Sequence, residues 1–511
     1  MTVSTRLFPD AYVDSVTQLV GMRAMLDIDG VGWASAAMAT PANVASLHGE
    51  GVAPDQTAGA AANDFLLVVR AADEETAAAA LAAGESAVFA ARPAAATTRE
   101  SEPGSLRDAV RRQPGSNVAV VSVPGQYAAL AAHQALGQDL HVLLFSDNVP
   151  VAAEVALKDH ARRRGLLMMG PGAGTALLGG VGLGFANVVR PGVVGIAAAA
   201  GTGAQEAMSL LDRWGAGVSQ VIGLGGRDLS GEVGGRMALS AVTALRDDPG
   251  TEVILLVTKP PAPEVAATVL AASGTTPLVA ALIGLEAAPP APPGVVVTGT
   301  LEPGVMATLR LLGVPAPDPT RTLGPSVQQV RRRLAPGRTA VRGLFAGGSL
   351  CYEALVVLGR TLGEVRSNTP LHDGWGLPAP AGSHQCLDLG AEEYTRGRPH
   401  PMIDAEARVE LLREHAREPS VAAVVLDVVL GLGAHPDPAA ALAPVCESVM
   451  ADGGPQVVVY VLGTEQDPQG YSTQRDRFVD AGCIVTETAA RASLVAAAIA
   501  TGDASLVGAD L

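Results

Sequence analysis

The chain has 511 residues, of which 48% are hydrophobic and only 3% aromatic, and its formal net charge is −16. This length exceeds what one hydrophobic core supports, so we expect three or four domains with cores of Ala, Val and Leu. The acidic balance excludes nucleic acid as an expected partner. The four cysteines contain no CxxC pair and predict reduced thiols in a cytoplasmic protein: Cys351, Cys386, Cys446 and Cys483.

The N-terminal segment, MTVSTRLFPDAYVDS, carries Pro and Asp where a signal peptide needs an apolar core. No run reaches the ~18–20 apolar residues of a membrane span, so we expect no membrane partner. Residues 1–91 alternate apolar strands with Ala-rich helices, as in 33–47 and 64–84, and predict a small N-terminal α/β domain. The Pro-, Arg- and Ser-rich stretch 92–116 is typical of a linker with one helical turn.

Residues 117–190 follow a strand–helix alternation. NVAVVSV, HVLLFSD and LLMMGPG are expected strands, and helical patterns separate them. Strands spaced in this way predict a parallel sheet with helices on both faces, as in a Rossmann-like domain.

A weak internal repeat follows at an offset of 147 residues. AAGTGAQEA (199–207) aligns with AGGSLCYEA (346–354), and two later strand patterns also correspond. We therefore predict two related α/β domains, 191–320 and 338–511, joined by residues 320–338, although two generic strand–helix turns would also align by chance.

Each copy opens with a strand, a glycine turn and a helix. Glycine lets the backbone approach a ligand closely, and a helix N-terminus presents free N–H groups and about half a positive charge. Such turns also need small residues for purely structural reasons. If the two copies face each other, however, their turns predict a phosphate cradle that needs no P-loop: Gly201, Thr202, Gly203, Gly347, Gly348 and Ser349.

Residues 162–231, including RRRGLLMMGPGAG, VVGIAAAAGTGAQEAMSLL and VIGLGGRDLSG, resemble the succinyl-CoA synthetase α subunit. GLFAGGSLCYEA, HQCLDLG and AVVLDVVLGLGAHPDPA, within 343–439, resemble the ligase domain of its β subunit. Over its full length the chain resembles the FdrA family, through ATPANV, FSDNV, GFANVV, TKPPA and GRPHPMID among other motifs. The resemblance implies a CoA-binding-type Rossmann-like domain at 117–190 and two flavodoxin-like ligase domains at 191–320 and 338–511.

Four synthetase features are missing. No His occurs between His160 and His372, where the family carries its phosphohistidine, and Lys259 stands near the position of the Glu that supports it. The glycine-rich CoA loop and the ATP-grasp half have no counterpart. We therefore expect no cofactor requirement of this chain, doubtful CoA binding, and phosphate or carbamoyl phosphate as substrate.

The FdrA resemblance implies a subunit of an oxamate carbamoyltransferase complex of purine (allantoin) breakdown, which converts oxalurate and phosphate into oxamate and carbamoyl phosphate. It also implies companion subunits, a downstream carbamate kinase and an oligomer. One alternative is an acyl-CoA ligase that uses a separate ATP-grasp subunit, and another is a non-catalytic scaffold that binds a phosphorylated metabolite.

Further candidates lie at expected strand ends. One is an expected turn at Gly225, Gly226 and Arg227. The guanidinium of Arg227 would bind an anion, or it would pair with Asp228. Lys259 precedes two prolines at the carboxyl end of a strand, where open α/β sheets bind ligands. Asn148, in FSDNV, would face the same side.

The proline-stiffened segment 395–404 offers Arg398 for the substrate carboxylate and His400 as proton donor. An incidental surface loop is the alternative. Its other charged residues, and three side chains elsewhere, are weaker candidates: Arg396, Asp404, His384, His435 and Asp437. No His, Cys and Asp spacing predicts a metal site.

Overall fold

The computed structural model describes residues 2–13, 15–89, 103–396 and 398–511. Contacts divide the chain into two compact units. One comprises Met1–Glu102 with Thr395–Pro399, and the other Pro103–Tyr394 with His400–Leu511. In the described ranges, no helix combines the length and apolarity needed to cross a membrane.

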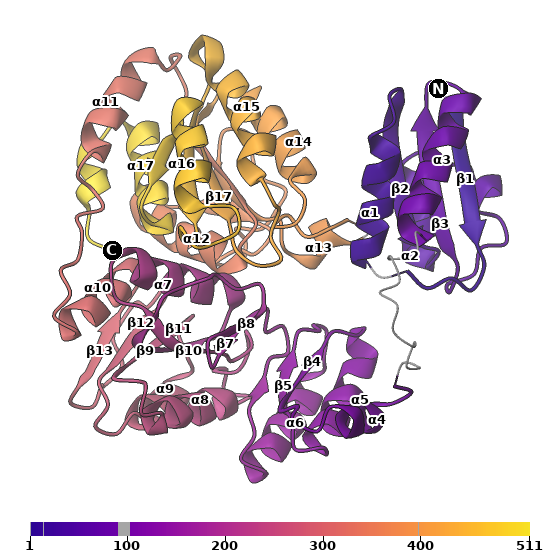
Figure 1. Ribbon diagram of the computed structural model, residues 1–511. Coiled ribbons are helices and arrows are strands. Elements are labelled where there is room, and N and C mark those ends of the chain that lie inside the picture. The colour runs from indigo at the N-terminus through magenta and orange to yellow at the C-terminus, as the bar shows by residue number, and fades with distance from the viewer. Residues whose placement is uncertain (1, 14, 90–102, 397) are drawn as a thin grey trace. The chain divides into compact units, whose positions relative to one another are not determined.

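The first unit is a three-stranded antiparallel sheet with helices packed on it (Figure 1). Strand β3 lies between β1 and β2, and its alternate residues face two small cores. Gly84 allows helices α1 and α3 to pack closely, because a Cβ there would lie 2.6 Å from Cγ of Met25. The elements are β1 (Thr2–Phe8), α1 (Ser15–Leu26), β2 (Val31–Met38), α2 (Pro41–Gly49), η1 (Pro54–Thr57), β3 (Phe65–Ala71) and α3 (Glu74–Phe89).

The second unit begins with a parallel three-stranded sheet in the order β4-β5-β6. Its strands are short, and their buried Val and Leu side chains pack against the two helices that connect them. The expected linker also forms a helix of seven residues. These elements are α4 (Leu106–Arg112), β4 (Val118–Val121), α5 (Gly125–Leu136), β5 (His141–Leu144), α6 (Val151–Arg163) and β6 (Met168–Met169).

A seven-stranded sheet follows, in the order β13-β12-β11-β9-β10-β7-β8. Helices α7 and α10 cover one face, and α8 and α9 cover the other. The elements are β7 (Thr175–Leu178), β8 (Val181–Gly184), β9 (Pro191–Ala198), α7 (Gly201–Arg213), β10 (Val218–Gly223), α8 (Arg236–Asp247), β11 (Val253–Thr258), α9 (Pro263–Ala271), β12 (Leu278–Leu282), β13 (Val295–Thr298) and α10 (Leu301–Leu311).

The division between sheets differs from the domain boundary expected at 190. Strands β7 and β8 form a hairpin, and β7 pairs antiparallel with β10 through Leu177 and Val221. This hairpin therefore extends the sheet of the following domain, because its backbone groups find partners there rather than in the β4-β5-β6 sheet.

The last sheet is fully parallel, in the order β15-β16-β14-β17-β18-β19. Helices α11, α12 and α17 cover one face, and α14, α15 and α16 the other. The elements are α11 (Leu323–Arg333), β14 (Ala340–Phe345), α12 (Gly348–Leu362), β15 (Val365–Ser367), β16 (His384–Asp388), α13 (Glu392–Thr395), α14 (Glu406–Ala416), β17 (Val421–Val429), α15 (Pro438–Met450), η2 (Ala451–Gly453), β18 (Gln456–Leu462), α16 (Tyr471–Asp480), β19 (Ile484–Thr486), α17 (Ala489–Thr501) and η3 (Ala504–Gly508).

The two large sheets share one topology. When the β7–β8 hairpin and β15 are left out and the remaining strands are numbered in chain order, each sheet contains the parallel order 2-1-3-4-5, as β10-β9-β11-β12-β13 and β16-β14-β17-β18-β19. This is the flavodoxin-like order. Helices α7 and α12 follow β9 and β14 and begin at Gly201 and Gly348, the two residues that the repeat aligned.

Two buried glutamates join the halves reciprocally. Oε1 of Glu353, on α12, accepts a hydrogen bond from the N–H of Leu301 at the start of α10, at 2.8 Å. Oε1 of Glu206, on α7, accepts one from the N–H of Ala489 at the start of α17, at 3.2 Å. Burial raises the pKa of Glu353 to about 7, and burial together with the charge of Glu353 raises the pKa of Glu206. Each half therefore caps the last helix of the other.

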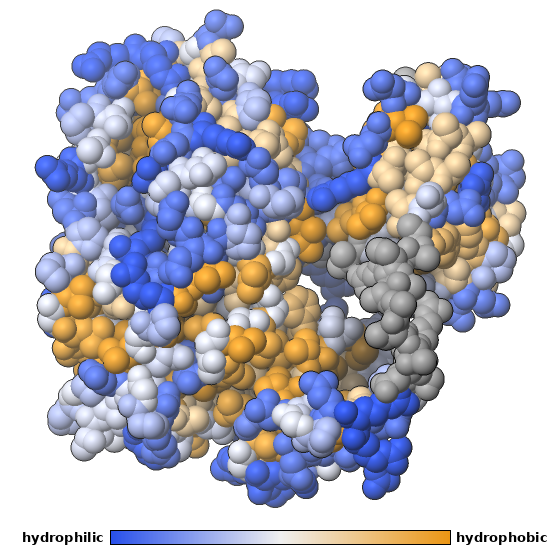
Figure 2. All heavy atoms as spheres, in the orientation of Figure 1, coloured by the Kyte–Doolittle hydropathy of each residue, from blue (hydrophilic) through white to orange (hydrophobic). Residues whose placement is uncertain are grey.

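The visible face of the second unit mixes hydrophilic and apolar side chains (Figure 2). Several apolar residues of β4 and α5 are exposed, with Val120, Tyr127 and Leu130 at 55%, 58% and 63%.

Candidate functional site

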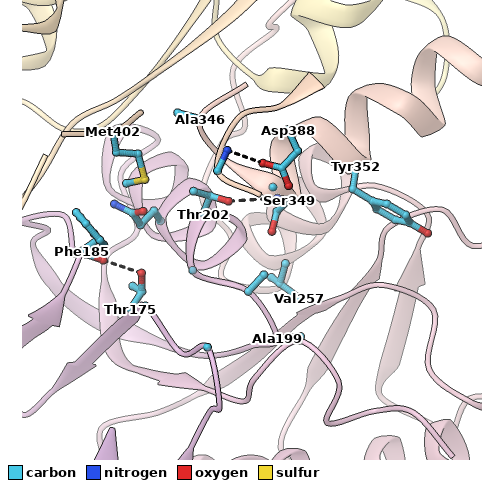
Figure 3. Close-up of a pocket in the computed structure, with 18 of the residues that line it drawn as sticks. Thr175, Phe185, Ala199, Thr202, Val257, Ala346, Ser349, Tyr352, Asp388 and Met402 are labelled. Carbon is cyan, nitrogen blue, oxygen red and sulfur yellow. Dashed lines mark hydrogen bonds between the residues drawn. The ribbon is translucent and has the colours of Figure 1, made fainter. Parts of the chain in front are cut away.

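The starts of α7 and α12 meet at one point. The N–H of Ser349 donates a hydrogen bond to Oγ1 of Thr202 at 3.3 Å, and Figure 3 shows these two residues facing each other. Since the positive ends of two helix dipoles converge here, the site favours an anion.

Glycines make this approach possible. A Cβ at Gly347 would lie 2.8 Å from Cγ2 of Thr202, and one at Gly203 would lie 3.4 Å from Oγ of Ser349. A Cβ at Gly201 would lie 3.0 Å from Oγ1 of Thr175. Larger residues at Gly347 in particular would push the two helix starts apart.

Several amide groups at the helix starts are unpaired. Neither N-cap residue supplies a side-chain hydrogen bond. Within the described ranges, the N–H groups of Gly201, Thr202, Gly203 and Gly348 have no acceptor. Such groups are normally satisfied by a side chain, water or a ligand.

A buried carboxylate holds the second turn in place. Asp427, on β17, accepts hydrogen bonds from the N–H groups of Ala346 and Gly347 at 2.7 and 2.8 Å. Arg408 lies 3.6 Å from the same carboxylate. These contacts fix the backbone of the β14–α12 turn, so that Gly348 and Ser349 face the start of α7.

A cavity of about 580 Å³ opens at these helix starts. Gly201, Thr202, Gly348 and Ser349 line it, whereas Gly203 and Gly347 lie at the contact between the helices. Loops that follow several strands complete the wall, and they bring the predicted residues Lys259, His400 and Gly226 to the same cavity. The structure thus gathers most of the predicted residues in one place.

Lys259 follows β11 and reaches the cavity over an aromatic ring. Its Nζ lies 4.1 Å from the centroid of the Tyr352 ring, so the partly exposed side chain forms a cation–π contact. Burial of the ammonium lowers the pKa of Lys259, and the charge of Asp388 opposes that shift.

Asp388, at the end of β16, is a site residue that the sequence did not single out. Its carboxylate lies beside the start of α12, because a Cβ at Gly348 would be 2.8 Å from Oδ2. Oδ1 accepts a hydrogen bond from the N–H of Gly390 at 3.0 Å, and Figure 3 shows Asp388 next to Ser349. Burial, together with the charge of Asp427, raises the pKa of Asp388 to about 6.

His400 lines the cavity, but its chemistry differs from the expected proton donor. The N–H of Met402 donates to Nδ1 at 3.2 Å, which leaves the proton of the neutral ring on Nε2. Burial and the charge of Arg408 lower the pKa of His400 to about 4. Near neutrality the ring therefore offers a neutral N–H rather than an acidic imidazolium.

Other predicted anion ligands have structural partners. Nη2 of Arg227 lies 2.9 Å from Oε2 of Glu154 and also donates to the carbonyl of Val149, so the guanidinium joins the loop to α6. Its expected alternative partner, Asp228, instead forms a buried ion pair with Lys158 at 2.8 Å. Arg227 therefore has a carboxylate partner in this structure, although not the expected Asp228, and its role as an anion clamp stays a prediction.

Two further predicted residues lie beside the cavity rather than on its wall. Gly225 has a φ of +90° and packs against the backbone of Gly170 and Pro171. Asn148 has a φ of +58°, and the preceding residue, Asp147, lines the cavity in its place.

Arg398 belongs to the first unit, where Nη2 lies 3.6 Å from Oε1 of Glu50. Its proposed contact with a substrate carboxylate stays a prediction, and so does any role of Arg396. Asp404 accepts from the N–H of Glu406 at 2.8 Å, which is a local backbone contact.

The three weaker candidates have structural contacts. Nδ1 of His384 accepts from the N–H of Val341, and Nδ1 of His435 accepts from the N–H of Asp437. Asp437 caps α15 and pairs with Arg477 at 2.7 Å. Across the described residues, no group of three or more His, Cys, Asp or Glu side chains could hold a metal ion.

The chain is similar in sequence to known protein families and to a full-length relative. Two family models match it, "CoA-ligase" over residues 344–499 and "AllF, heavy metal-associated domain" over residues 1–103. The protein named "Uncharacterized protein YahF" from Escherichia coli K12 is 38% identical over 508 residues, which cover 97% of this chain and 98% of that protein. The chain belongs to the YahF family.

More distant relatives of this YahF-family chain include the α subunits of ADP-forming succinate–CoA ligases. The subunit from Methanothermobacter thermautotrophicus is 27% identical over 28% of this chain, and that from Staphylococcus epidermidis is 28% identical over 29%. The match spans about half of each subunit. Together with the CoA-ligase model and the observed sheets, they establish a succinyl-CoA-synthetase-like, multidomain α/β chain with a small N-terminal α/β domain.

Solved structures show a fainter likeness. ATP citrate lyase from Methanothrix soehngenii, solved with citrate and coenzyme A, is 17% identical over 42% of each chain, with a TM-score of 0.33. An overlap of this extent says nothing about substrate.

Proposed function

We propose that this YahF-family chain is an FdrA-type subunit of a phosphate-dependent carbamoyltransferase, which converts oxalurate and phosphate into oxamate and carbamoyl phosphate. The observation that carries the proposal is the meeting of two helix starts with unpaired amides at one cavity. They would bind phosphate as its dianion, with Lys259 adding positive charge.

The reaction makes clear demands on the site. A phosphate oxygen forms a bond to the ureido carbonyl carbon, and negative charge develops on the carbonyl oxygen. Preorganised donors stabilise such charge, each contributing about 3 kcal/mol. The neutral Nε2–H of His400 and the ammonium of Lys259 line the cavity and are our candidates for this role.

The proton balance assigns a role to Asp388. When hydrogen phosphate attacks, its proton must reach the oxamate nitrogen as the C–N bond breaks. A carboxyl group with a pKa of about 6, beside the start of α12, is suited to accept that proton and return it to the leaving nitrogen.

Direct transfer is favoured over a phosphohistidine relay. The loop after β12 carries Gly284, Leu285 and Glu286 where the succinyl-CoA synthetase resemblance places a histidine. The two ring nitrogens of His400 are also occupied. Nδ1 accepts from the N–H of Met402, and Nε2 carries the proton and so lacks the free lone pair that a nucleophile needs.

An acyl-CoA ligase that works with a separate ATP-grasp subunit is the second candidate, and the CoA-ligase family match over 344–499 favours it. A non-catalytic, metabolite-binding scaffold is a third candidate. Either enzyme would need companion subunits, and the exposed apolar residues on β4 and α5 offer a surface for one.

The test is co-purification with the products of neighbouring genes, followed by an assay of oxalurate turnover. The proposal predicts carbamoyl phosphate release that requires phosphate and neither ATP nor CoA. Turnover that requires ATP and CoA would support the ligase instead. Metabolite binding without turnover by any reconstituted complex would support the scaffold.

A further inference from the structure

Gln205 contributes an unsatisfied acceptor to the candidate site. It lies on the first turns of α7, lines the cavity and is 1% exposed. Its Nε2 donates to Oδ1 of Asn187 at 3.2 Å, whereas its Oε1 has no hydrogen-bond partner among the described residues. A buried acceptor without a donor is costly, so this oxygen requires an explanation.

The orientation of the Gln205 amide is fixed by its neighbours. Nδ2 of Asn187 donates to the carbonyl of Leu430 at 3.0 Å and to Oδ2 of Asp467 at 2.8 Å. Both contacts need donors, so Oδ1 of Asn187 must face Gln205 and must accept from Nε2. Exchanging the two ends of the Gln205 amide would place two oxygens against each other.

Asp467 anchors this relay in the second half of the chain. Its carboxylate also accepts from the N–H of Val188 and from the N–H of Thr464, each at 2.8 Å. The Asp467 carboxylate thus fixes the orientation of the Asn187 amide, and Asn187 fixes that of the Gln205 amide. The unpaired atom of Gln205 is therefore its carbonyl oxygen, Oε1.

We infer that Oε1 of Gln205 accepts an N–H of the substrate and selects a carbamoyl group, which bears an amino group, over an acyl group that bears a methyl group. This inference rests on the proposed function and names the substrate class of the same site. The helix starts and Lys259 offer donors and positive charge, which suit phosphate oxygens. Gln205 offers the complementary acceptor, which a methyl group cannot satisfy.

Two stable phosphonates isolate this interaction. Phosphonoacetamide carries an NH2 group where acetonylphosphonate carries CH3, and the two are otherwise alike. Calorimetry on the full chain should show phosphonoacetamide binding about 10- to 100-fold more tightly, since the methyl ligand leaves the acceptor unpaired. Inorganic phosphate, titrated in parallel, reports on the helix starts alone.

The variant Gln205→Met removes the acceptor and keeps a similar side-chain volume. It should bind the two phosphonates within about threefold of each other and retain its affinity for inorganic phosphate. Met402→Leu, an apolar change on the same cavity wall, controls for altered packing and should keep the preference.

The outcomes separate this inference from the proposed function. If the wild-type chain binds phosphate but does not discriminate between the phosphonates, or if Gln205→Met keeps the preference, the role of Gln205 is refuted and the phosphate site stands. If the wild-type chain binds none of the three ligands, the phosphate site itself is refuted, and this inference with it.

Discussion

Asp388 and His400 are the two residues of the cavity to which the proposed function assigns a proton-transfer or hydrogen-bonding role. Both line the cavity, and burial shifts both pKa values, but in opposite senses. The carboxyl pKa rises to about 6 and the imidazole pKa falls to about 4. Near pH 6 the Asp388 carboxyl group therefore gains and loses protons, whereas the His400 imidazole stays neutral and keeps its N–H as a hydrogen-bond donor.

The first prediction concerns Asp388→Asn. In the reconstituted complex this variant should lower kcat for carbamoyl phosphate formation by about 10²- to 10⁴-fold, because the amide cannot carry the proton. The wild-type rate should fall as the pH drops through about 6, where the carboxylate becomes protonated, and the variant should lack this inflection. A variant that keeps both wild-type kcat and the inflection would show that Asp388 does not transfer the proton.

At the scale of elements, two contacts decide how the site is held. Thr202 joins the start of α7 to the start of α12. Lys158 pairs with Glu154 on the same helix, α6, at 2.7 Å, and its ion pair with Asp228 at 2.8 Å joins α6 to the loop that precedes α8. The Asp228 carboxylate also accepts from the N–H groups of Met237 and Ala238, so it organises the start of α8.

The second prediction compares Thr202→Val with Thr202→Ser. Valine removes the oxygen that accepts from Ser349 and the hydroxyl that would donate to a bound anion, so phosphate affinity should fall about five- to tenfold. Serine keeps the hydroxyl and should bind nearly as well as threonine. Equal affinities for the valine and serine variants, measured by calorimetry, would argue against a role for this contact.

The third prediction concerns Lys158→Met, which leaves the buried Asp228 carboxylate without its cation, while Glu154 keeps its contact with Arg227. It should destabilise the chain by about 3–5 kcal/mol. Arg162→Met, on the same helix, removes an ion pair to Asp159 whose arginine side chain is 61% exposed, and should cost at most about 1 kcal/mol. Urea denaturation compares the two variants, and similar midpoints for both would contradict the structural role of Lys158.

At the scale of the whole molecule, the two large α/β halves, which share one strand order, are joined by reciprocal helix capping. Glu206 and Glu353 occupy equivalent positions in the repeat, and each caps a helix of the other half. Arg491, on α17, adds an ion pair to Glu302 on α10 at 2.6 Å. Because the candidate site forms where the halves meet, this interface sets the geometry of the helix starts.

The fourth prediction follows from the raised pKa of Glu353. The Glu353 carboxyl group keeps its proton up to about pH 7 in the folded state but only up to about pH 4.5 in the unfolded chain. The contribution of protonated Glu353 to folding stability is therefore complete below pH 4.5 and is lost as the pH rises through about 7. Glu353→Gln mimics the protonated form and keeps the acceptor for Leu301. Its stability relative to the wild type should rise between pH 5 and pH 8.5, by roughly 2–3 kcal/mol at most. A constant difference between the two urea midpoints across this range would contradict the assignment.

Sequence patterns predicted the fold class, both helix starts and the cavity positions of Lys259 and His400, because local periodicity and strand-end position determine them. They did not predict Asp388 or Gln205. The role of Gln205 depends on Asn187 and Asp467, which lie 280 residues apart in the chain. The ion pair between Arg227 and Glu154 was missed for the same reason, since packing between distant elements creates it.

The most direct test of the account is a crystal structure of the full chain grown with millimolar inorganic phosphate. The account predicts a phosphate ion within hydrogen-bond distance of the amides at Gly201–Gly203 and Gly348, with Thr202 and Ser349 on either side. Phosphate absent from the helix starts, or bound only elsewhere on the molecule, would contradict it.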